Sequence, residues 1–302
     1  MRAGSFFPAL LERRRRVDQA LFAVVMAAYV HGVSTRKVDD LVKALGADAG
    51  ISKSEVSRIC AGLDAEVAQF RDRTLTAQEF PYVFLDATYC KARVGHRIVS
   101  QVVVVGVGVA ADGRREVLGF DVGDSENEGF WTAFLRSLKT RGLNGVKLVM
   151  SDAHTGLEKA IGTVFQGAGW QRCRVHFRRN VLAVVPKGSQ DMVASIIRTI
   201  FAQPEMLAFA AFPRRHWRQI WSTNPLERVN KEIKRRTDVV GVFPNPAALL
   251  RLAGSVLIEQ HDEWEAGEGR YFSESSMLEL AVMNNPVEVI DEAVILPELA
   301  AA

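Results

Sequence analysis

Three acidic residues of this 302-residue chain stand where a carboxylate could do chemistry, and the first is Asp86. It interrupts the apolar run of residues 82–87, which predicts a strand in the interior of a sheet. A charged carboxylate is costly to bury unless hydrogen bonds or a cation compensate it. Asp86 is therefore either a buried, hydrogen-bonded aspartate or a ligand of a metal ion.

The second acidic residue, Asp152, follows a short predicted strand at residues 146–150 and precedes a predicted helix. Aspartate is a favoured helix N-cap, so a cap is the competing interpretation. The third, Glu227, lies in a predicted helix where Asn224 suits the N-cap and Pro225 the first helical position. Glu227 could close a capping box there. Together the three carboxylates offer the hard oxygen ligands that suit Mg²⁺ or Mn²⁺.

The helix that carries Glu227 also carries basic residues. Lys231 and Lys234 follow Glu227 at helical spacing and share its predicted face, with Arg235 and Arg236 behind. The apolar residues form a separate, buried stripe: Leu226, Val229 and Ile233. A carboxylate beside cations suits a site where a phosphate backbone passes over bound metal. Glu232 is a second candidate, but it points to another face of the helix.

Cys173 and His176 form a C-x2-H pair. A zinc site needs four ligands, and the sequence has no second closely spaced pair, so a structural or substrate-contacting role is favoured. Arg174, Arg178 and Arg179 crowd the same stretch and fit contacts with phosphate.

Charge is distributed unevenly along the chain, although the net charge is only +3. Residues 170–240 hold 14 Lys and Arg against 5 Asp and Glu, whereas residues 241–302 hold 2 against 11. The basic stretch indicates a polyanionic partner, or simply a solvated helical surface. The acidic end predicts a peripheral tail or an internal mimic of the same polyanion.

Composition narrows the class of protein. The chain is 48% apolar and 24% charged, as in ordinary globular proteins. Three widely spaced cysteines argue against a disulfide framework. No apolar run reaches the roughly 18 residues of a membrane helix, and no signal peptide is evident. We therefore expect a cytoplasmic protein with no membrane partner.

The first 80 residues predict helices, at residues 17–31, at residues 35–45 and from Ser52 onward, where Glu55 completes a capping box. Short helices joined by a tight turn are typical of a helix-turn-helix, although any small helical bundle gives the same pattern. In the first interpretation the residues facing DNA are Ser52, Lys53, Ser54, Ser57 and Arg58.

The period of the pattern changes after a polar linker at residues 71–79. Three strands are predicted in a meander, at residues 82–89, 97–109 and 116–122. Helices at 128–141 and 154–165 then alternate with strands at 146–150 and 170–175. This order is that of a ribonuclease H-like α/β domain with a mixed five-stranded sheet flanked by helices, preceded by an all-α region.

Four sequence blocks resemble the Mutator-like family of bacterial insertion-sequence transposases. The blocks are FLDATY at residues 84–89, SDAHTGL at 151–157, CRVH at 173–176 and STNPLER at 222–228. The spaced Cys and His between the second Asp and the Glu is that family's mark. The similarity runs from about Ser5 to Met277.

The resemblance implies a DDE transposase on a ribonuclease H-like fold, with Asp86, Asp152 and Glu227 as the three acids. They would hold two Mg²⁺ or Mn²⁺ ions about 3.5–4 Å apart, as two-metal phosphoryl-transfer sites do. One ion would activate water or a 3′-hydroxyl and the other would stabilise the leaving oxygen. The implied partners are double-stranded DNA, as terminal inverted repeats and target, and further copies of the chain, in the nucleoid.

The chain also departs from that family. Members insert a helical domain between the C-x2-H block and the Glu helix, but here only 47 residues separate Asn180 from Glu227, and residues 203–207 read like a junction. The alternative function is a shortened chain that binds DNA or a full-length partner without cutting and inhibits transposition. The predicted regions are residues 1–80 (helical, DNA-binding), 81–180 (catalytic core), 181–220 (shortened insertion), 221–262 (Glu helix region) and 263–302 (acidic tail).

Overall fold

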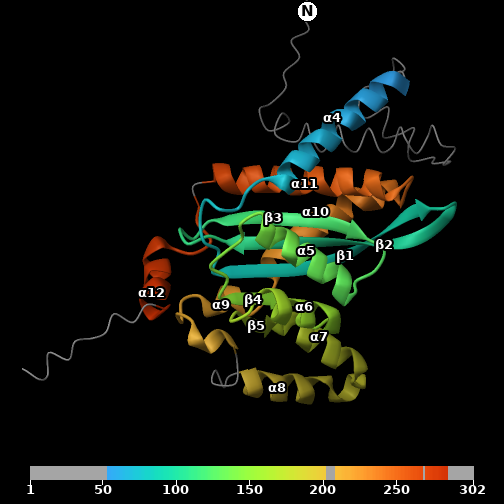
Figure 1. Ribbon diagram of the computed structural model, residues 1–302. Helices are drawn as coiled ribbons and strands as arrows, with labels where there is room; N and C mark the ends of the chain where they lie inside the picture. Colours follow the sequence, from blue (N-terminus) through green and yellow to red (C-terminus); the bar gives the residue numbers. More distant parts are fainter. Residues whose placement is uncertain (1–52, 202–207, 268, 285–302) are drawn as a thin grey trace, which may run out of the picture.

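The fold is seen in a computed structural model that describes residues 53–201, 208–267 and 269–284 (Figure 1). The predicted helices at residues 17–31 and 35–45, and Ser52, lie outside the described residues. Among those described, no helix is both long enough and apolar enough to span a membrane.

A mixed sheet forms the centre, in the strand order β3-β2-β1-β4-β5. The strands are β1 (Tyr82–Val94), β2 (Arg97–Val109), β3 (Arg115–Gly123), β4 (Leu148–Ser151) and β5 (Gly169–Arg172). The first three are antiparallel, and β4 and β5 add parallel strands beside β1. The predicted α/β architecture with a mixed sheet is confirmed, but the count of five strands is wrong. A two-residue strand, β6 (Val242–Phe243), also pairs with β1, and it is too short to show a period in the sequence.

Helices cover both faces of the sheet (Figure 1). One core packs α5 (Glu128–Thr140) and α6 (Thr155–Val164) against the sheet, and Val83 and Leu85 of β1 belong to it. The other core holds Tyr82 and Phe84, which alternate with them along the strand. Its helices are α4 (Lys53–Asp72), α10 (Asn224–Val240), α11 (Pro246–Ala266) and α12 (Glu274–Asn284).

Helix α4 packs as part of this second core rather than apart from it. Leu63 and Val67 are buried there, and Arg251 of α11 donates two hydrogen bonds to Asp64, at 2.8 and 2.7 Å. Arg58, predicted to face DNA, is exposed. The side chains of the other residues of that set lie outside the described part of the chain: Ser52, Lys53, Ser54 and Ser57.

The described residues between β5 and α10 form mostly helices. The predicted strand at residues 170–175 is wrong at its end, because β5 stops at Arg172 and a helix begins two residues later. The elements that follow are α7 (Arg174–Val184), η1 (Lys187–Ser189), α8 (Gln190–Phe201), η3 (Ala208–Ala211) and α9 (Trp217–Ile220). After α11, Met277 and Leu280 of α12 are buried, so the predicted acidic tail begins with a packed helix.

Candidate active site

Asp86 and Asp152 lie at the same level of two neighbouring strands because of strand register. Strands β1 and β4 run parallel, with Phe84 opposite Met150. Each aspartate comes two residues after that pair, so the two carboxylates leave neighbouring strands at the same level. The sequence predicted this pairing from the fold type, and the register provides the reason.

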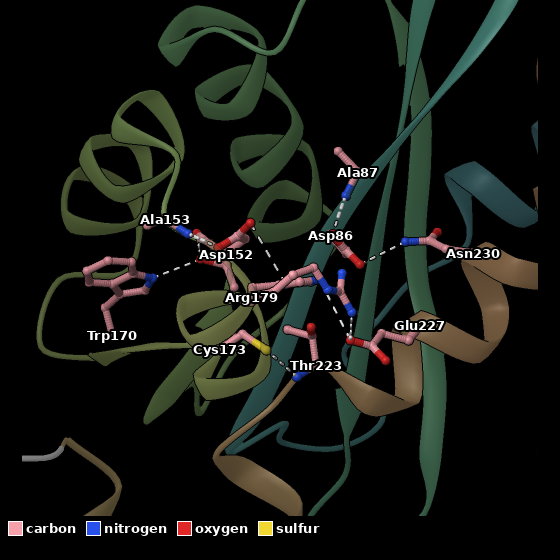
Figure 2. A network of polar contacts seen from close by, with 12 residues as sticks. Asp86, Ala87, Asp152, Ala153, Trp170, Cys173, Arg179, Thr223, Glu227 and Asn230 are labelled. Carbon is pink, nitrogen blue, oxygen red and sulfur yellow. Dashed lines mark hydrogen bonds and ion pairs between the residues drawn. The ribbon is translucent and has the colours of Figure 1, made fainter. Parts of the chain in front are cut away.

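Asp86 is hydrogen-bonded at both oxygens. Its Oδ1 accepts from the Ala87 backbone N–H at 2.9 Å, and its Oδ2 accepts from Asn230 Nδ2 at 2.8 Å (Figure 2). Burial raises the pKa of Asp86 to about 6, although these hydrogen bonds and the nearby His176 oppose the rise. The carboxylate is therefore held in a fixed orientation and carries an unusually high affinity for a proton.

Asp152 does not cap the helix that follows it. His154 occupies the N-cap of α6, and its Nδ1 accepts a hydrogen bond from the Leu157 N–H at 3.4 Å. Asp152 instead turns its Oδ1 toward the N–H of Ala153, at 2.7 Å, and its Oδ2 lies 3.9 Å from Nδ1 of His176. The N-cap interpretation is thus wrong, and the carboxylate is left facing His176.

Glu227 does not close a capping box either. The N-cap of α10 is Thr223, not Asn224, so the predicted start of the helix is wrong by one residue. The carboxylate extends away from the helix end instead. Its Oε1 lies 3.7 Å from Nε2 of His176 and 3.9 Å from the guanidinium of Arg179.

His176 stands between two of the acids and near the third. One ring nitrogen faces Asp152 and the other faces Glu227, and the charge of Asp86 also acts on it. A hydrogen bond with Cys173 is the largest influence that raises the pKa of His176, to about 9, and the aspartates add to it. At neutral pH the imidazole is a cation among carboxylates from β1, β4 and α10.

Cys173 ties the start of α7 to the start of α10. Its Sγ accepts a hydrogen bond from the Thr223 N–H at 3.4 Å (Figure 2). The neighbouring Arg174 N–H donates to the carbonyl of Trp221 at 3.0 Å. Burial raises the pKa of the Cys173 thiol, but hydrogen bonds from His176 and Thr223 outweigh it, and the net pKa is lowered. The C-x2-H spacing is explained by this: Cys173 anchors the helix, and His176 one turn later reaches the acids.

The oxygen donors fit a hard divalent cation in chemical type. Oε1 of Glu227 is buried and accepts no hydrogen bond from the described residues, although His176 and Arg179 lie within ion-pair distance of it. As the side chains stand, however, no group of three His, Cys, Asp or Glu in the described chain is placed to hold one ion together. His176 and Arg179 supply the positive charge between the carboxylates instead.

The predicted DNA-contacting residues differ in how free they are. Arg178 and Arg179 on α7 and Lys231 on α10 are exposed. Arg174 is half-buried, with its guanidinium over the ring of Phe201, at 4.1 Å from the ring centroid. It is part of the packing around α7, which the sequence did not indicate.

The basic residues further along α10 are engaged within the protein. Lys234 donates to the carbonyl of Tyr89 on β1. Arg235 and Arg236 both pair with Glu232, at 2.6 and 3.0 Å. The hydrogen bonds from Arg235, followed by those from Arg236, lower the pKa of Glu232 to about 2. Glu232 lies on a different face of α10 from Glu227, and its ion pairs hold Arg235 and Arg236 near that face.

Asn230 was missed from the sequence. It lies one turn after Glu227 on α10, so the helix that presents the third acid also holds the first acid in place. The available signal was the spacing: residues at i and i+3 share a helix face, and an amide beside Glu227 on a site-facing helix was a candidate.

Comparison with known proteins decides the family. The family profile described as "Transposase, Mutator family" matches residues 1–206 and 202–267. The chain belongs to the Mutator family of transposases. The four sequence blocks that resembled this family therefore lead to the correct assignment. All three candidate acids, Asp86, Asp152 and Glu227, fall inside the matched residues.

Several relatives of this Mutator-family chain are insertion-sequence transposases. It is 43% identical over 300 residues to the transposase for insertion sequence element IS1081 of Mycobacterium tuberculosis, with 88% of this chain and 72% of the relative covered. It is 35% identical to the transposase for IS256 in transposon Tn4001 of Staphylococcus aureus, with 90% and 78% covered. A pre-cleavage Mos1 transpososome structure aligns at 10% identity with a TM-score of 0.20, covering 90% of this chain and 83% of that one, and a likeness at this level does not define a fold.

Proposed function

We propose that this Mutator-family chain cuts and joins DNA at the ends of an insertion sequence, with Asp86, Asp152 and Glu227 as the catalytic carboxylates on a ribonuclease H-like fold. The observation that carries the proposal is the position of His176, at 3.9 Å from Asp152 and 3.7 Å from Glu227. Carboxylates from two distant segments therefore face one another across a single imidazole. The short connection between them does not keep α10 from docking beside β1 and β4.

The proposed cofactor is Mg²⁺ or Mn²⁺, as two ions bound by the three carboxylates. Such ions would supply Lewis acidity for attack by a hydroxyl and for departure of the leaving oxygen in phosphoryl transfer. Asn230 fixes the orientation of Asp86, and the hydrogen bond from Ala87 fixes its second oxygen. Arg179, which lies 3.9 Å from Glu227, and Lys231, one turn after Glu227 on α10, would contact the DNA backbone, since phosphate contacts from Arg and Lys position a duplex without reading its sequence.

His176 has a separate part in this proposal. A cation between Asp152 and Glu227 offsets the repulsion that two nearby carboxylates would otherwise exert. Cys173 holds the imidazole in place from the other side. The C-x2-H pair would thus keep the acids assembled, so the proposed site is organised before DNA arrives.

The experiment is a cleavage and strand-transfer assay on labelled DNA that carries the inverted repeats flanking the gene, in Mg²⁺ or Mn²⁺. The test variant is Glu227→Gln, and the matched control is Asp238→Asn, an exposed acid on the same helix. We expect metal-dependent strand cleavage that Glu227→Gln abolishes and Asp238→Asn retains, with DNA binding intact in both. Equal cleavage by Glu227→Gln and wild type would remove Glu227 from the chemistry.

A second candidate is a chain that binds DNA, or a full-length partner, without cutting. Two observations favour it: among the described residues no three His, Cys, Asp or Glu side chains are close enough together to hold one metal ion, and the family profile matches in two separate segments, which overlap at residues 202–206. Binding to the repeats with no cleavage in either metal would support this candidate. Inhibition of a full-length relative's cleavage by the added chain would then establish its role.

A further inference from the structure

A cavity of about 450 Å³ opens between α7 and α8, next to the candidate active site. Its volume is within the range of sites that take a small organic ligand. Every charged residue that lines it is an arginine: Arg174, Arg178, Arg179 and Arg198. With no lining carboxylate among the described residues, the cavity favours an anionic occupant.

The apolar part of the cavity wall contains two aromatic rings beside the aliphatic Val175, Leu182 and Ile197. Phe201 at the end of α8 and Trp221 before α10 both line it. The guanidinium of Arg174 lies over these rings, 4.1 Å from the Phe201 centroid and 4.6 Å from the Trp221 centroid, and donates to the Phe201 carbonyl at 3.3 Å. Flat rings and a fixed guanidinium are the surfaces on which nucleobases stack. A bare phosphate would make no use of them.

The cavity also shares one residue, Arg179, with the candidate active site. Arg179 lines it and at the same time lies 3.9 Å from Oε1 of Glu227. Arg178 and Arg198 are exposed at its rim. A ligand whose flat part lies against Trp221 would therefore have its anionic part among arginines and its continuation at Glu227.

We propose that this cavity binds one unpaired nucleotide of a DNA strand whose cleavage occurs at the adjacent carboxylates. The base packs beside the Arg174 guanidinium and the edges of Phe201 and Trp221, and the phosphates pair with Arg178 and Arg198. A base inside a duplex has both faces covered by its neighbours, so only a base that has left the stack can bind in this way. The inference rests on the proposed DNA-cleaving function and adds to it a subsite for single-stranded DNA at the cut.

The test is a binding measurement in EDTA, without metal, so that it does not depend on cleavage. Two probes of equal length and equal charge are compared: a fully paired duplex, and the same duplex with two mispaired terminal nucleotides, one of them 2-aminopurine. We expect the wild-type chain to bind the frayed duplex about tenfold more tightly, which is the effect of one stacked base. The 2-aminopurine fluorescence should be quenched on binding, as stacking on an aromatic ring requires.

Trp221→Leu removes a ring and should abolish the tenfold preference while affinity for the paired duplex stays unchanged. Arg178→Gln changes only an exposed side chain and should lower the preference about threefold, which keeps the test decisive should Trp221→Leu fail to fold. Ile196→Ala is the matched control, because Ile196 lies on α8 outside the cavity and is 52% exposed. It should leave the preference intact.

The proposal is overturned by a wild-type chain with no preference for the frayed duplex, or by 2-aminopurine whose fluorescence does not change. A different outcome would also overturn it: a peptide of residues 285–302 binds tightly to the wild-type chain without displacing either DNA probe, and Trp221→Leu abolishes this binding. The cavity would then be a groove for an acidic peptide. Loss of the preference leaves the cleavage assay unaffected, and absence of cleavage leaves the preference unaffected. The two proposals can therefore fail separately.

Discussion

Asn230 on α10 donates a hydrogen bond to Asp86 on β1, at 2.8 Å between Nδ2 and Oδ2. The residues are 144 positions apart in sequence, and the bond joins the helix of the third acid to the strand of the first. The other amide atom of Asn230, Oδ1, is buried with no partner in the described part of the chain. The orientation of the Asp86 carboxylate therefore depends on the packing of α10 against β1.

The first prediction concerns this contact. Asn230→Ala removes a donor to a buried carboxylate, and hydrogen bonds to charged groups are worth about 1.5–3 kcal/mol. The pKa of Asp86, already raised to about 6, should rise further, so that less of it is ionised at pH 7. In the cleavage assay we expect the Mn²⁺ concentration for half-maximal rate to rise about tenfold at pH 7 and to recover partly at pH 8.5. An unchanged Mn²⁺ dependence would show that Asn230 does not act through Asp86.

The second prediction separates the basic residues of α10 by their contacts. Lys231 is exposed, whereas Arg235 is paired with Glu232. Each lost phosphate contact lowers the slope of log affinity against log salt by close to one. Lys231→Gln should lower the slope by about one for DNA of any sequence, and Arg235→Gln by much less. Titrations by fluorescence anisotropy between 50 and 200 mM salt measure both, and equal slopes for the two variants would contradict the assignment.

The third prediction is a pH dependence of stability. His216 is buried, its Nδ1 and the Tyr82 hydroxyl share a hydrogen bond of 2.7 Å, and burial lowers the pKa of His216 to about 4. The unfolded chain has an ordinary histidine pKa of about 6.5, so it takes up a proton first as pH falls. The stabilisation is therefore complete above about pH 6.5 and is lost between there and about pH 4, by up to about 3 kcal/mol.

The contribution of His216 must be measured as the difference in unfolding free energy between the wild type and a variant without this histidine, because Asp86 and His176 also have shifted pKa values. Urea unfolding of wild type and His216→Phe at pH 7.5 and 5.0 should show that the wild type loses more stability on acidification. Tyr82→Phe keeps the buried imidazole and should behave like the wild type. The same loss in His216→Phe as in the wild type would assign the effect to other groups.

The fourth prediction concerns the pairing of α4 with α11. Arg251 has a side chain only 9% exposed, and Asp64 is its bidentate partner. Asp64→Ala leaves the buried guanidinium without this carboxylate and should cost about 2 kcal/mol of unfolding free energy. Glu274→Ala breaks the more exposed pair with Arg270, at 2.9 Å, and should cost less than about 1 kcal/mol. Equal losses in denaturant unfolding would show that α4 is not held by Arg251.

Local patterns predicted much of the sheet and its helices. The valine-rich run of residues 97–109 corresponds to β2 residue for residue, and Leu226, Val229 and Ile233 form the buried stripe of α10 as their spacing predicts. Strand β6 was missed because two residues carry no period. The i+3 and i+4 spacing of Arg235 and Arg236 from Glu232 is itself a signal for the ion pairs that the structure shows, and it competes with the prediction of DNA contact at these two arginines.

The site depended on contacts that no local pattern contains. The three acids were chosen from their residue types and from the family resemblance, and their roles stay predictions. The placement of His176 between Asp152 and Glu227 requires that segments 51 residues apart in sequence meet in space. The capping expectations for Asp152 and Glu227 were wrong for a related reason: tertiary partners, His176 and Arg179, draw these carboxylates away from the helix ends.

The bond between Cys173 and Thr223 has a consequence for length variation. The chain departs from the sheet at Cys173 and returns to the same point 50 residues later, at Thr223. The residues between these two positions therefore form a loop whose ends are held together, and the entropic cost of closing a loop grows only slowly with its length. A whole domain could therefore be inserted or deleted between Cys173 and Thr223 while the segments that carry His176 and Glu227 stay in place. The Cys173–Thr223 hydrogen bond thus lets the intervening segment change in length without moving the site.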